Sequence, residues 1–122
     1  MAVMTFNLHH GFDIQSSDGV ETHHEVGLRE LTSSDIIDAQ LAAEKVVVQG
    51  EKALAYTSDV LVGLELLRRQ VEYIGEYPGP LSIKDLRKLH PDDLGMLQAK
   101  ADELDKILAE ELGRRGRAET AG

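Results

Sequence analysis

Residues 73–98 read YIGEYPGPLSIKDLRKLHPDDLGMLQ and contain all three prolines of the chain. Because proline cannot continue a helix and favours extended geometry in the residue before it, the stretch EYPGP predicts a break. Ser82 and Asp85 have the spacing of a capping box and predict a short helix over residues 83–89. Pro91 suits the first turn of a further helix. The segment therefore predicts a corner that reverses the chain between two longer helices.

Apolar residues at helical spacing predict a long helix on each side of this corner. Before it, Ser58 caps a predicted helix over residues 59–74, and Gly75 suits the left-handed residue that ends a helix. After it, a spacing of alternately three and four residues predicts a helix over residues 92–112. The two apolar stripes include Leu64, Leu67, Val71, Leu97, Leu104 and Leu108.

The N-terminal residues alternate between apolar and polar side chains and predict a β-hairpin over residues 4–29. A two-residue turn at the Asp-Gly step would mix apolar and polar side chains on each face. A five-residue loop over residues 15–19 instead pairs Ile14 with Val20 and gathers the apolar residues of both strands on one face. We expect the longer loop, because a slip of one residue would turn that face toward water.

Between the hairpin and the first long stripe lies LTSSDIIDAQLAAEKVVV, which predicts another helix. Thr32 and Asp35 have capping-box spacing, and the apolar positions that follow favour a helix over about residues 34–48. Gly50 would end it. Residues 49–57 are open to two interpretations, a loop or a short helical link.

Length and composition are typical of one small domain. The chain has 122 residues, 42% of them hydrophobic but only 4% aromatic, so its core is expected to be aliphatic. We expect an α+β fold in which an N-terminal antiparallel β-hairpin packs on a small bundle of three to four α-helices. The domain is expected to span residues 1–113, with a flexible tail over residues 114–122.

Charge and cysteine content exclude several kinds of partner and site. A net charge of −9 repels duplex nucleic acid, which proteins bind by neutralising phosphates. The absence of cysteine excludes disulfides and thiolate metal sites and is typical of a reducing compartment. We also expect no membrane partner, because no apolar run approaches the roughly 20 residues that cross a bilayer, and the first residues lack the pattern of a signal peptide.

The histidines and carboxylates offer little chemistry in this interpretation. In the preferred register His10 faces His24 across the hairpin, close enough to share a metal ion. A third ligand is missing because Asp13, Glu21 and Glu25 point to the other face, so a stacked or hydrogen-bonded pair is expected and no metal site. No nucleophile turn and no glycine-rich phosphate loop is present in the sequence. We expect no enzyme and no cofactor.

The amphipathic helices are the remaining candidates for function. The simplest interpretation is that their stripes pack against the hairpin. A second interpretation is that the surface built from the six stripe residues named above serves core and partner alike. The near-heptad spacing of residues 92–112 is also compatible with a homo-oligomer.

Several short motifs resemble those of a known family. VGLREL at residues 26–31, followed by Asp35 and Ala39, and then residues 66–105 are similar to the tail assembly chaperones of Mu-like contractile-tailed bacteriophages and prophages. The motifs with matching order and spacing are Arg69-Gln70-Val71, Gly75, Gly79-Pro80-Leu81-Ser82, Asp85-Leu86 and Leu89-His90-Pro91-Asp92-Asp93-Leu94.

This resemblance implies a role and a set of partners. Such chaperones bind the tape measure protein in the host bacterial cytoplasm and keep it soluble until the tail tube protein polymerises around it. They are absent from the mature virion, and many have a longer, frameshifted form. Two other classes remain open, a structural tail-completion or tube-associated virion protein and a small bacterial regulatory module.

Overall fold

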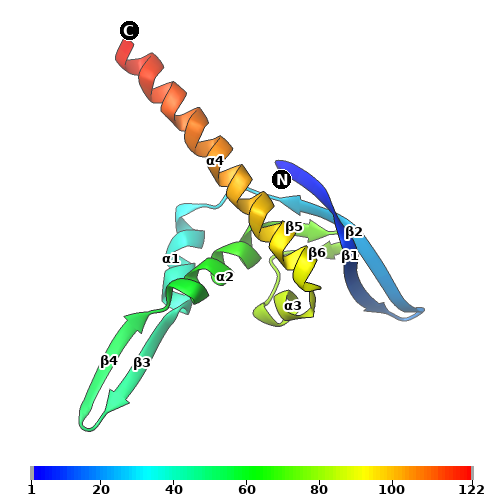
Figure 1. The fold of residues 1–122 in the computed structure, drawn as a ribbon, viewed down its shortest axis with the longest axis horizontal. Coiled ribbons are helices and arrows are strands. Elements are labelled where there is room, and N and C mark those ends of the chain that lie inside the picture. The colour runs from blue at the N-terminus through cyan, green and yellow to red at the C-terminus, as the bar shows by residue number, and fades with distance from the viewer. Residues whose placement is uncertain (1, 122) are drawn as a thin grey trace.

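The computed structural model describes the backbone of residues 2–121 and the side chains of residues 2–45, 48 and 50–113. Its larger sheet has four antiparallel strands in the order β1-β2-β5-β6 (Figure 1). These strands are β1 (Met4–Ser16), β2 (Gly19–Leu28), β5 (Val71–Ile74) and β6 (Tyr77–Pro78). The predicted N-terminal hairpin is therefore present as β1 and β2, and it forms half of a larger sheet.

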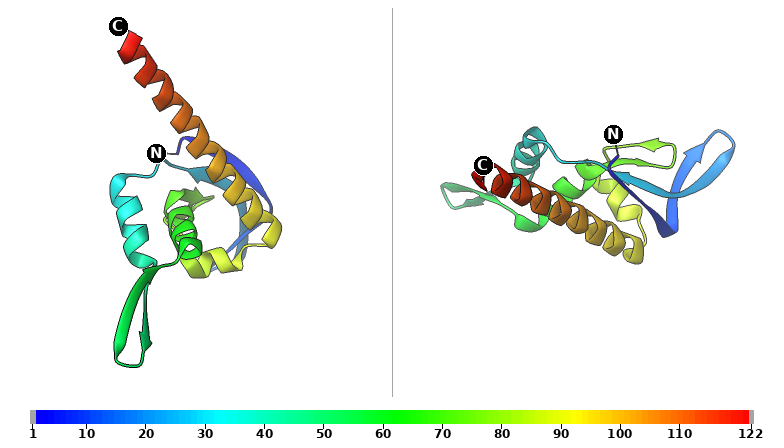
Figure 2. Two further views of the ribbon diagram at one scale, coloured as in Figure 1. Left: turned by 60° about the vertical axis from the view of Figure 1, so that its left-hand side comes forward. Right: turned by 90° about the horizontal axis from the view of Figure 1, so that it is seen from above.

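Four helices and a second hairpin complete the fold. The helices are α1 (Ser33–Ala42), α2 (Asp59–Gln70), α3 (Ile83–Lys88) and α4 (Pro91–Ala121). The second hairpin consists of β3 (Glu44–Gln49) and β4 (Lys52–Thr57). It projects from the adjoining ends of α1 and α2, while α4 runs past the larger sheet and extends beyond it (Figures 1 and 2). The predicted α+β class, with an antiparallel hairpin packed on helices, is confirmed.

The core joins the larger sheet to α2, α3 and α4. One cluster of buried apolar side chains includes residues from all of these elements, and no described residue of the β3–β4 hairpin belongs to it. Its members are Leu8, Phe12, Val26, Leu28, Leu67, Val71, Ile74, Leu81, Leu86, Leu89, Leu97, Ala101 and Leu104. The core is aliphatic apart from Phe12, as the composition predicts.

The local helix starts agree with the sequence. The Thr32 hydroxyl accepts a hydrogen bond from the backbone of Asp35, whose carboxylate accepts one in return from the Thr32 backbone. Ser82 and Asp85 form the same reciprocal pair at α3. Pro91 is the first residue of α4. The helices α1, α3 and α4 therefore begin where their capping residues and Pro91 predict.

The predicted helix over residues 34–48 is wrong in its second half. The helix α1 ends at Ala42, and β3 begins at Glu44. Three consecutive valines fall in β3, where their branched side chains fit a pleated strand better than a helix. Residues 49–57 are neither a loop nor a helical link, because most of them form the turn and the second strand of a hairpin.

The predicted helix over residues 59–74 is also too long. The helix α2 ends at Gln70, and the next four residues form β5 beside β2. Val71 and Ile74 lie opposite buried residues of β2 and are themselves buried, so the sheet takes the residues that continue the apolar stripe. Gly75 has a positive φ of 58°, as predicted, but it lies in the turn between β5 and β6 and not at a helix end.

The predicted register of the first hairpin is wrong as well. Ser16 pairs with Gly19 across a two-residue turn, so the five-residue loop does not form. Farther along, the register shifts between Asn7 and Phe12, where β1 contains three more residues than β2. The extra residues form a bulge in β1, so the two strands do not share the single regular register that the sequence predicts.

The last helix is longer than predicted. The backbone of α4 continues as helix from Pro91 to Ala121, past the predicted end at residue 112. The side chains of the predicted tail, residues 114–122, lie outside the described part of the chain. The domain boundary at residue 113 stays a prediction.

Candidate partner-binding surface

The six residues predicted to form a shared core and partner surface divide into two groups. Leu67, Val71, Leu97 and Leu104 belong to the core, each with at most 5% of its surface exposed. Leu64 and Leu108 are partly buried and pack against the edge of that core. Four of the six are therefore used by the fold itself, and only two lie where a partner could reach them.

Leu64 lines a groove between α2 and α4, which we call the α2–α4 groove. Its volume is about 430 Å³. The groove is lined by Asp59, Val60, Gly63, Leu64, Leu66, Leu67, Gln70, Gln98, Ala101, Asp102 and Asp105. The Gln70 amide donates a hydrogen bond of 3.1 Å to the Asp105 carboxylate and so connects the two helices. The groove combines aliphatic side chains with three carboxylates.

Leu108 lines a second groove, which we call the Leu31–Leu112 groove. It has a volume of about 270 Å³ and lies between the segment after β2 and the outer part of α4. Its lining consists of Glu30, Leu31, Leu108, Glu111 and Leu112. Leu112 is 66% exposed. This groove therefore also places leucines beside carboxylates.

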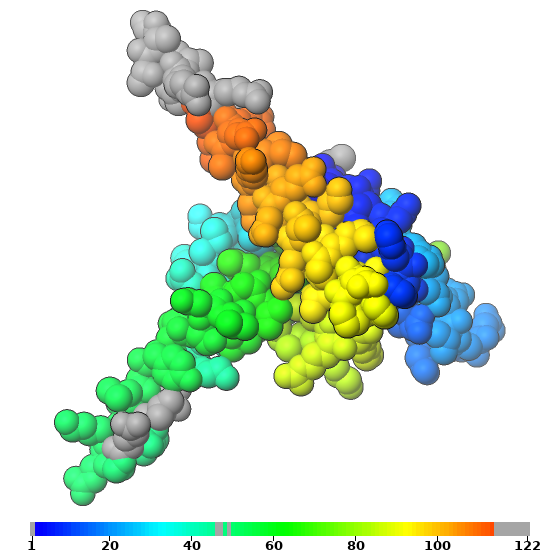
Figure 3. All heavy atoms as spheres, viewed as in Figure 1, coloured from blue at the N-terminus to red at the C-terminus, as the bar shows by residue number. Residues whose placement is uncertain are grey.

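A third apolar region lies on α1 and the β3–β4 hairpin, where sequence reasoning placed no site. Its exposed large apolar residues are Ile36, Ile37, Leu41, Val48, Leu54 and Tyr56. Every described side chain of this hairpin is exposed, and the hairpin projects away from the main body (Figure 3). The adjacent isoleucines and Leu41 lie partly off the apolar face predicted for the helix over residues 34–48. These additional apolar residues are the sequence signal from which this region could have been predicted.

Ion pairs form within α2 and at the start of α1, two of the helices that carry these surfaces. Glu65 is buried on α2, where Arg68 and Arg69 both donate to its carboxylate. Burial acts to raise the pKa of Glu65, but the hydrogen bonds from Arg69 and Arg68 outweigh it, so the pKa is lowered. On the loop before α1, Arg29 donates two hydrogen bonds to Asp35, and they lower the pKa of that carboxyl. Both carboxylates are therefore charged at neutral pH.

The bulge in β1 is held by an aspartate from the other end of the chain. The backbone N–H groups of His9, His10 and Gly11 donate to the Asp93 carboxylate at 2.8, 3.0 and 3.0 Å. Asp93 is fully buried, which acts to raise its pKa, but these three hydrogen bonds lower it overall. Gly11 has a φ of 90°, a left-handed conformation that side chains other than glycine rarely adopt. The bulge and the start of α4 form one unit.

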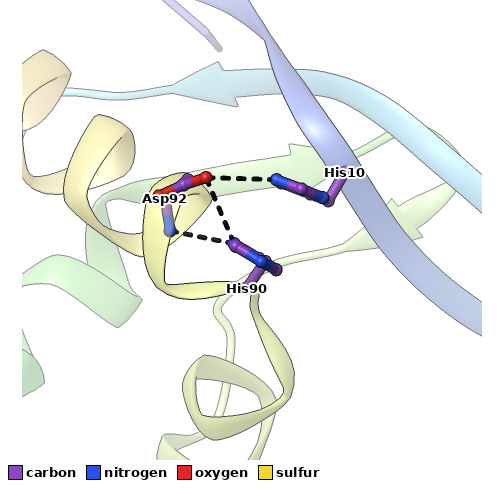
Figure 4. Close-up of side chains that lie close together, drawn as sticks. All are labelled: His10, His90 and Asp92. Carbon is purple, nitrogen blue, oxygen red and sulfur yellow. Dashed lines mark hydrogen bonds and ion pairs between the residues drawn. The ribbon is translucent and has the colours of Figure 1, made fainter.

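The bulge also changes the predicted histidine pair. His10 does not face His24, whose ring contacts the Leu8 carbonyl at 3.0 Å. The His10 ring instead stacks on His90, with ring centroids 3.6 Å apart, and both rings lie beside Asp92 (Figure 4). The three extra residues of the bulge carry His10 out of the predicted register, so the pairing with His24 is wrong.

The fold and these surfaces define an acidic α+β protein with apolar, carboxylate-lined grooves beside its last helix. None of the helices in the described residues has the length and apolar character needed to cross a membrane. Residues 8–117 match the model of the family described as "Tail assembly protein gp41". The chain belongs to this family of Mu-like tail assembly proteins, as the short sequence motifs predict.

Its relatives come from a phage and a prophage. The chain is 43% identical over 105 residues to the "Mu-like prophage FluMu protein gp41" of Haemophilus influenzae, a match that covers 84% of this chain and 82% of the relative. It is 42% identical over 108 residues to the "Probable tail assembly protein gp41" of Escherichia phage Mu, covering 88% and 75%. "Probable tail assembly protein FS-gp41" of the same phage is 41% identical over 102 residues, covering 84% and 54%. No solved structure matches the chain.

Proposed function

We propose that this tail assembly protein is a non-enzymatic chaperone that binds the tape measure protein and keeps it soluble while the tail tube polymerises around it. The observation that carries the proposal is a tail assembly family member with apolar side chains exposed on three helices. A tape measure protein is expected to be long and largely helical. An amphipathic helix can bind another protein by placing its apolar face in an apolar groove.

The α2–α4 groove gives this partner a definite chemistry. Its aliphatic residues would contact an apolar stripe, and Asp59, Asp102 and Asp105 would lie beside the edges of that stripe. Carboxylates in these positions favour lysine or arginine in the partner, and the net charge of −9 would keep the complex soluble. We expect the bound segment to be a basic amphipathic helix.

The proposal extends to other forms and to location. Phage Mu has both a gp41 and an FS-gp41 relative, and the match covers a smaller share of the second. This supports a longer, frameshifted form of the present chain that shares the described domain. We propose that the protein acts in the host bacterial cytoplasm, contacts the tail tube protein only during assembly and is absent from the mature virion. The exposed end of the apolar stripe on α4 could also pack against the same stripe of a second copy of the chain and form a homo-oligomer.

Co-expression with the tape measure protein tests the binding directly. Val60, which is 77% exposed in the α2–α4 groove, is changed to lysine, which removes apolar surface and repels a basic helix. Val20, 58% exposed on the β1–β2 hairpin, is changed to lysine as the matched control. We expect the wild type and Val20→Lys to keep the tape measure protein soluble and to co-purify with it, and Val60→Lys to fail. If the tape measure protein co-purified equally with both variants, the α2–α4 groove would not be its binding site.

The composition of purified particles separates this function from its alternative. A chaperone is absent from finished tails, whereas a tail-completion or tube-associated protein is present in fixed stoichiometry. Mass spectrometry of purified virions decides between them. Detection at structural copy number would replace the chaperone function with a structural one.

A further inference from the structure

We infer that His10, His90 and Asp92 form a binding site for one divalent transition-metal ion such as zinc. The three side chains come from β1, from the residue before α4 and from the first turn of α4. One potential ligand atom from each lies within 4.8 Å of the other two. The inference concerns a site outside the grooves proposed for the tape measure protein, so either can fail without the other.

The distances among these atoms fit a small coordination polyhedron. The Asp92 Oδ2 atom lies 3.3 Å from His10 Nε2 and 3.6 Å from His90 Nδ1. Two ligand atoms of a tetrahedral zinc ion, each bonded at about 2.0–2.1 Å, are separated by about 3.3–3.5 Å. Figure 4 shows one nitrogen of each ring on the side that faces Asp92. The two ring nitrogens are within 4.8 Å of each other, and both rings would have to tilt out of their stack for the lone pairs, which lie in the ring planes, to point at one ion.

The hydrogen bonding at His90 Nδ1 is already suited to a metal. The backbone N–H of Asp92 lies 3.1 Å from His90 Nδ1, and because an N–H group can only donate, this nitrogen presents a lone pair. A metal ion would replace that hydrogen bond. His10 Nε2 would have to exchange its contact with the Asp92 carboxylate for a bond to the metal, with loss of its proton.

The supporting backbone constrains two of the three ligands, His10 and Asp92. His10 lies on the bulge whose N–H groups bind Asp93, and Asp93 is the neighbour of Asp92 on α4. The buried aspartate therefore joins the strand that carries one histidine to the helix start that carries the carboxylate. Ligands held in this way lose little freedom when a metal ion binds.

The site is open to solvent. The side chains of His10, His90 and Asp92 are 46%, 45% and 70% exposed. Their rings have room to tilt away from the parallel stack, whose interplanar angle is 11°. Three protein ligands leave a fourth position for water. The positive end of the α4 dipole opposes a cation here, whereas the Asp92 carboxylate and the acidic surface favour one.

The donor set also predicts selectivity. Two imidazoles and one carboxylate suit zinc, nickel or copper, while magnesium prefers oxygen ligands and keeps its water shell. We therefore expect saturable binding of one zinc ion per chain at micromolar concentrations and no comparable binding of magnesium.

The experiment uses the untagged full chain, because an added histidine tag would itself bind metal. Zinc sulfate is titrated into the chelator-treated protein by calorimetry, and Tm is measured with zinc and with magnesium. The variants are His10→Ala and His90→Ala, and the control is His9→Ala, which removes a neighbouring exposed imidazole and keeps the backbone N–H that binds Asp93.

The expected result is one zinc per wild-type chain, a higher Tm with zinc alone, and His9→Ala behaving as the wild type. Each of the other two variants should weaken zinc binding by more than the roughly 10–100-fold that loss of an outer-shell partner costs. Circular dichroism without metal checks that each variant is folded. Absence of saturable zinc binding by the wild type, or undiminished binding by both folded variants, would overturn the inference.

Discussion

Replacing Asp93 by alanine should destabilise the fold far more than replacing its neighbour Asp92. Both aspartates stand in the first turn of α4 and contribute similarly to the helix dipole. Asp93 is fully buried and accepts three backbone hydrogen bonds from the β1 bulge, whereas the Asp92 side chain is 70% exposed. The pair therefore isolates the contribution of the buried contact between Asp93 and the backbone of the β1 bulge.

The size of the effect follows from those contacts. Hydrogen bonds to a charged group contribute about 1.5–3 kcal/mol each, so three set an upper bound of roughly 5–9 kcal/mol. Two terms reduce this bound. The buried carboxylate has its own desolvation cost, and the freed N–H groups of His9 and His10 can reach water because both residues are exposed. We expect Asp93→Ala to cost about 3–5 kcal/mol and Asp92→Ala less than about 1 kcal/mol.

Urea unfolding followed by far-ultraviolet circular dichroism measures both variants. With a slope of about 1–3 kcal/mol per molar urea, the Asp93→Ala midpoint should fall by on the order of 2 M. A fold of this length has a total stability of about 6–18 kcal/mol, so the variant should still fold at low temperature. Hydrogen exchange should show faster exchange at the amides of His9, His10 and Gly11. If the two variants unfold within about 1 kcal/mol of each other, the bulge does not depend on Asp93 and the reasoning is wrong.

Three further predictions test the bulge, the α1 cap and the core. Gly11→Ala should lower the unfolding free energy by at least about 1–2 kcal/mol in urea titrations, because its φ of 90° is unfavourable for alanine; an unchanged midpoint would contradict this. Because Arg29 lowers the pKa of Asp35, the contribution of this ion pair to the unfolding free energy is complete above about pH 4. It is lost as pH falls through the lowered pKa of Asp35 in the folded state. Asp35→Asn should therefore cost about 1–3 kcal/mol at pH 7, and a difference from the wild type that did not shrink in acid would refute the pairing. Leu104→Ala should cost about 2–5 kcal/mol and Leu112→Ala under about 0.5 kcal/mol by chemical denaturation, since only Leu104 is buried; equal costs would contradict the assigned core.

The features predicted well from the sequence are those decided by neighbouring residues. The caps at Thr32 and Ser82 depend on side chains three residues away, and Pro91 acts on its own backbone. The aliphatic character of the core follows from composition. Such local effects are visible in a single sequence because the groups that interact lie within a few residues of one another.

The features that were missed depend on distant contacts. The β1 bulge binds Asp93, more than 80 residues away, and no periodicity in the N-terminal sequence contains that information. Val71 and Ile74 continue a helical stripe in the sequence, yet they pair with β2 because the sheet offers them complete burial. His10 reaches His90 only because of the bulge. Tertiary contacts overrode local preference in each case.

Buried leucines also explain why the predicted partner surface was only partly accessible. A helical stripe identifies residues that avoid water but does not say whether the core or a partner covers them. Leu97→Asp or Leu104→Asp would place a charge in the core, so loss of tape measure solubilisation by either variant would report unfolding. The exposed Val60 provides a test that leaves the core intact.

The burial gradient along α4 connects the core to the proposed binding surface. Leu97 is completely buried and Leu104 nearly so, Leu108 is partly buried, and Leu112 is 66% exposed. One apolar stripe therefore begins in the core and continues past the end of the sheet that covers it. Where an apolar stripe extends beyond the core, its leucines are exposed to water unless another molecule covers them. We therefore expect a second partner contact on α4 near Leu108, at the Leu31–Leu112 groove, in addition to the contact in the α2–α4 groove.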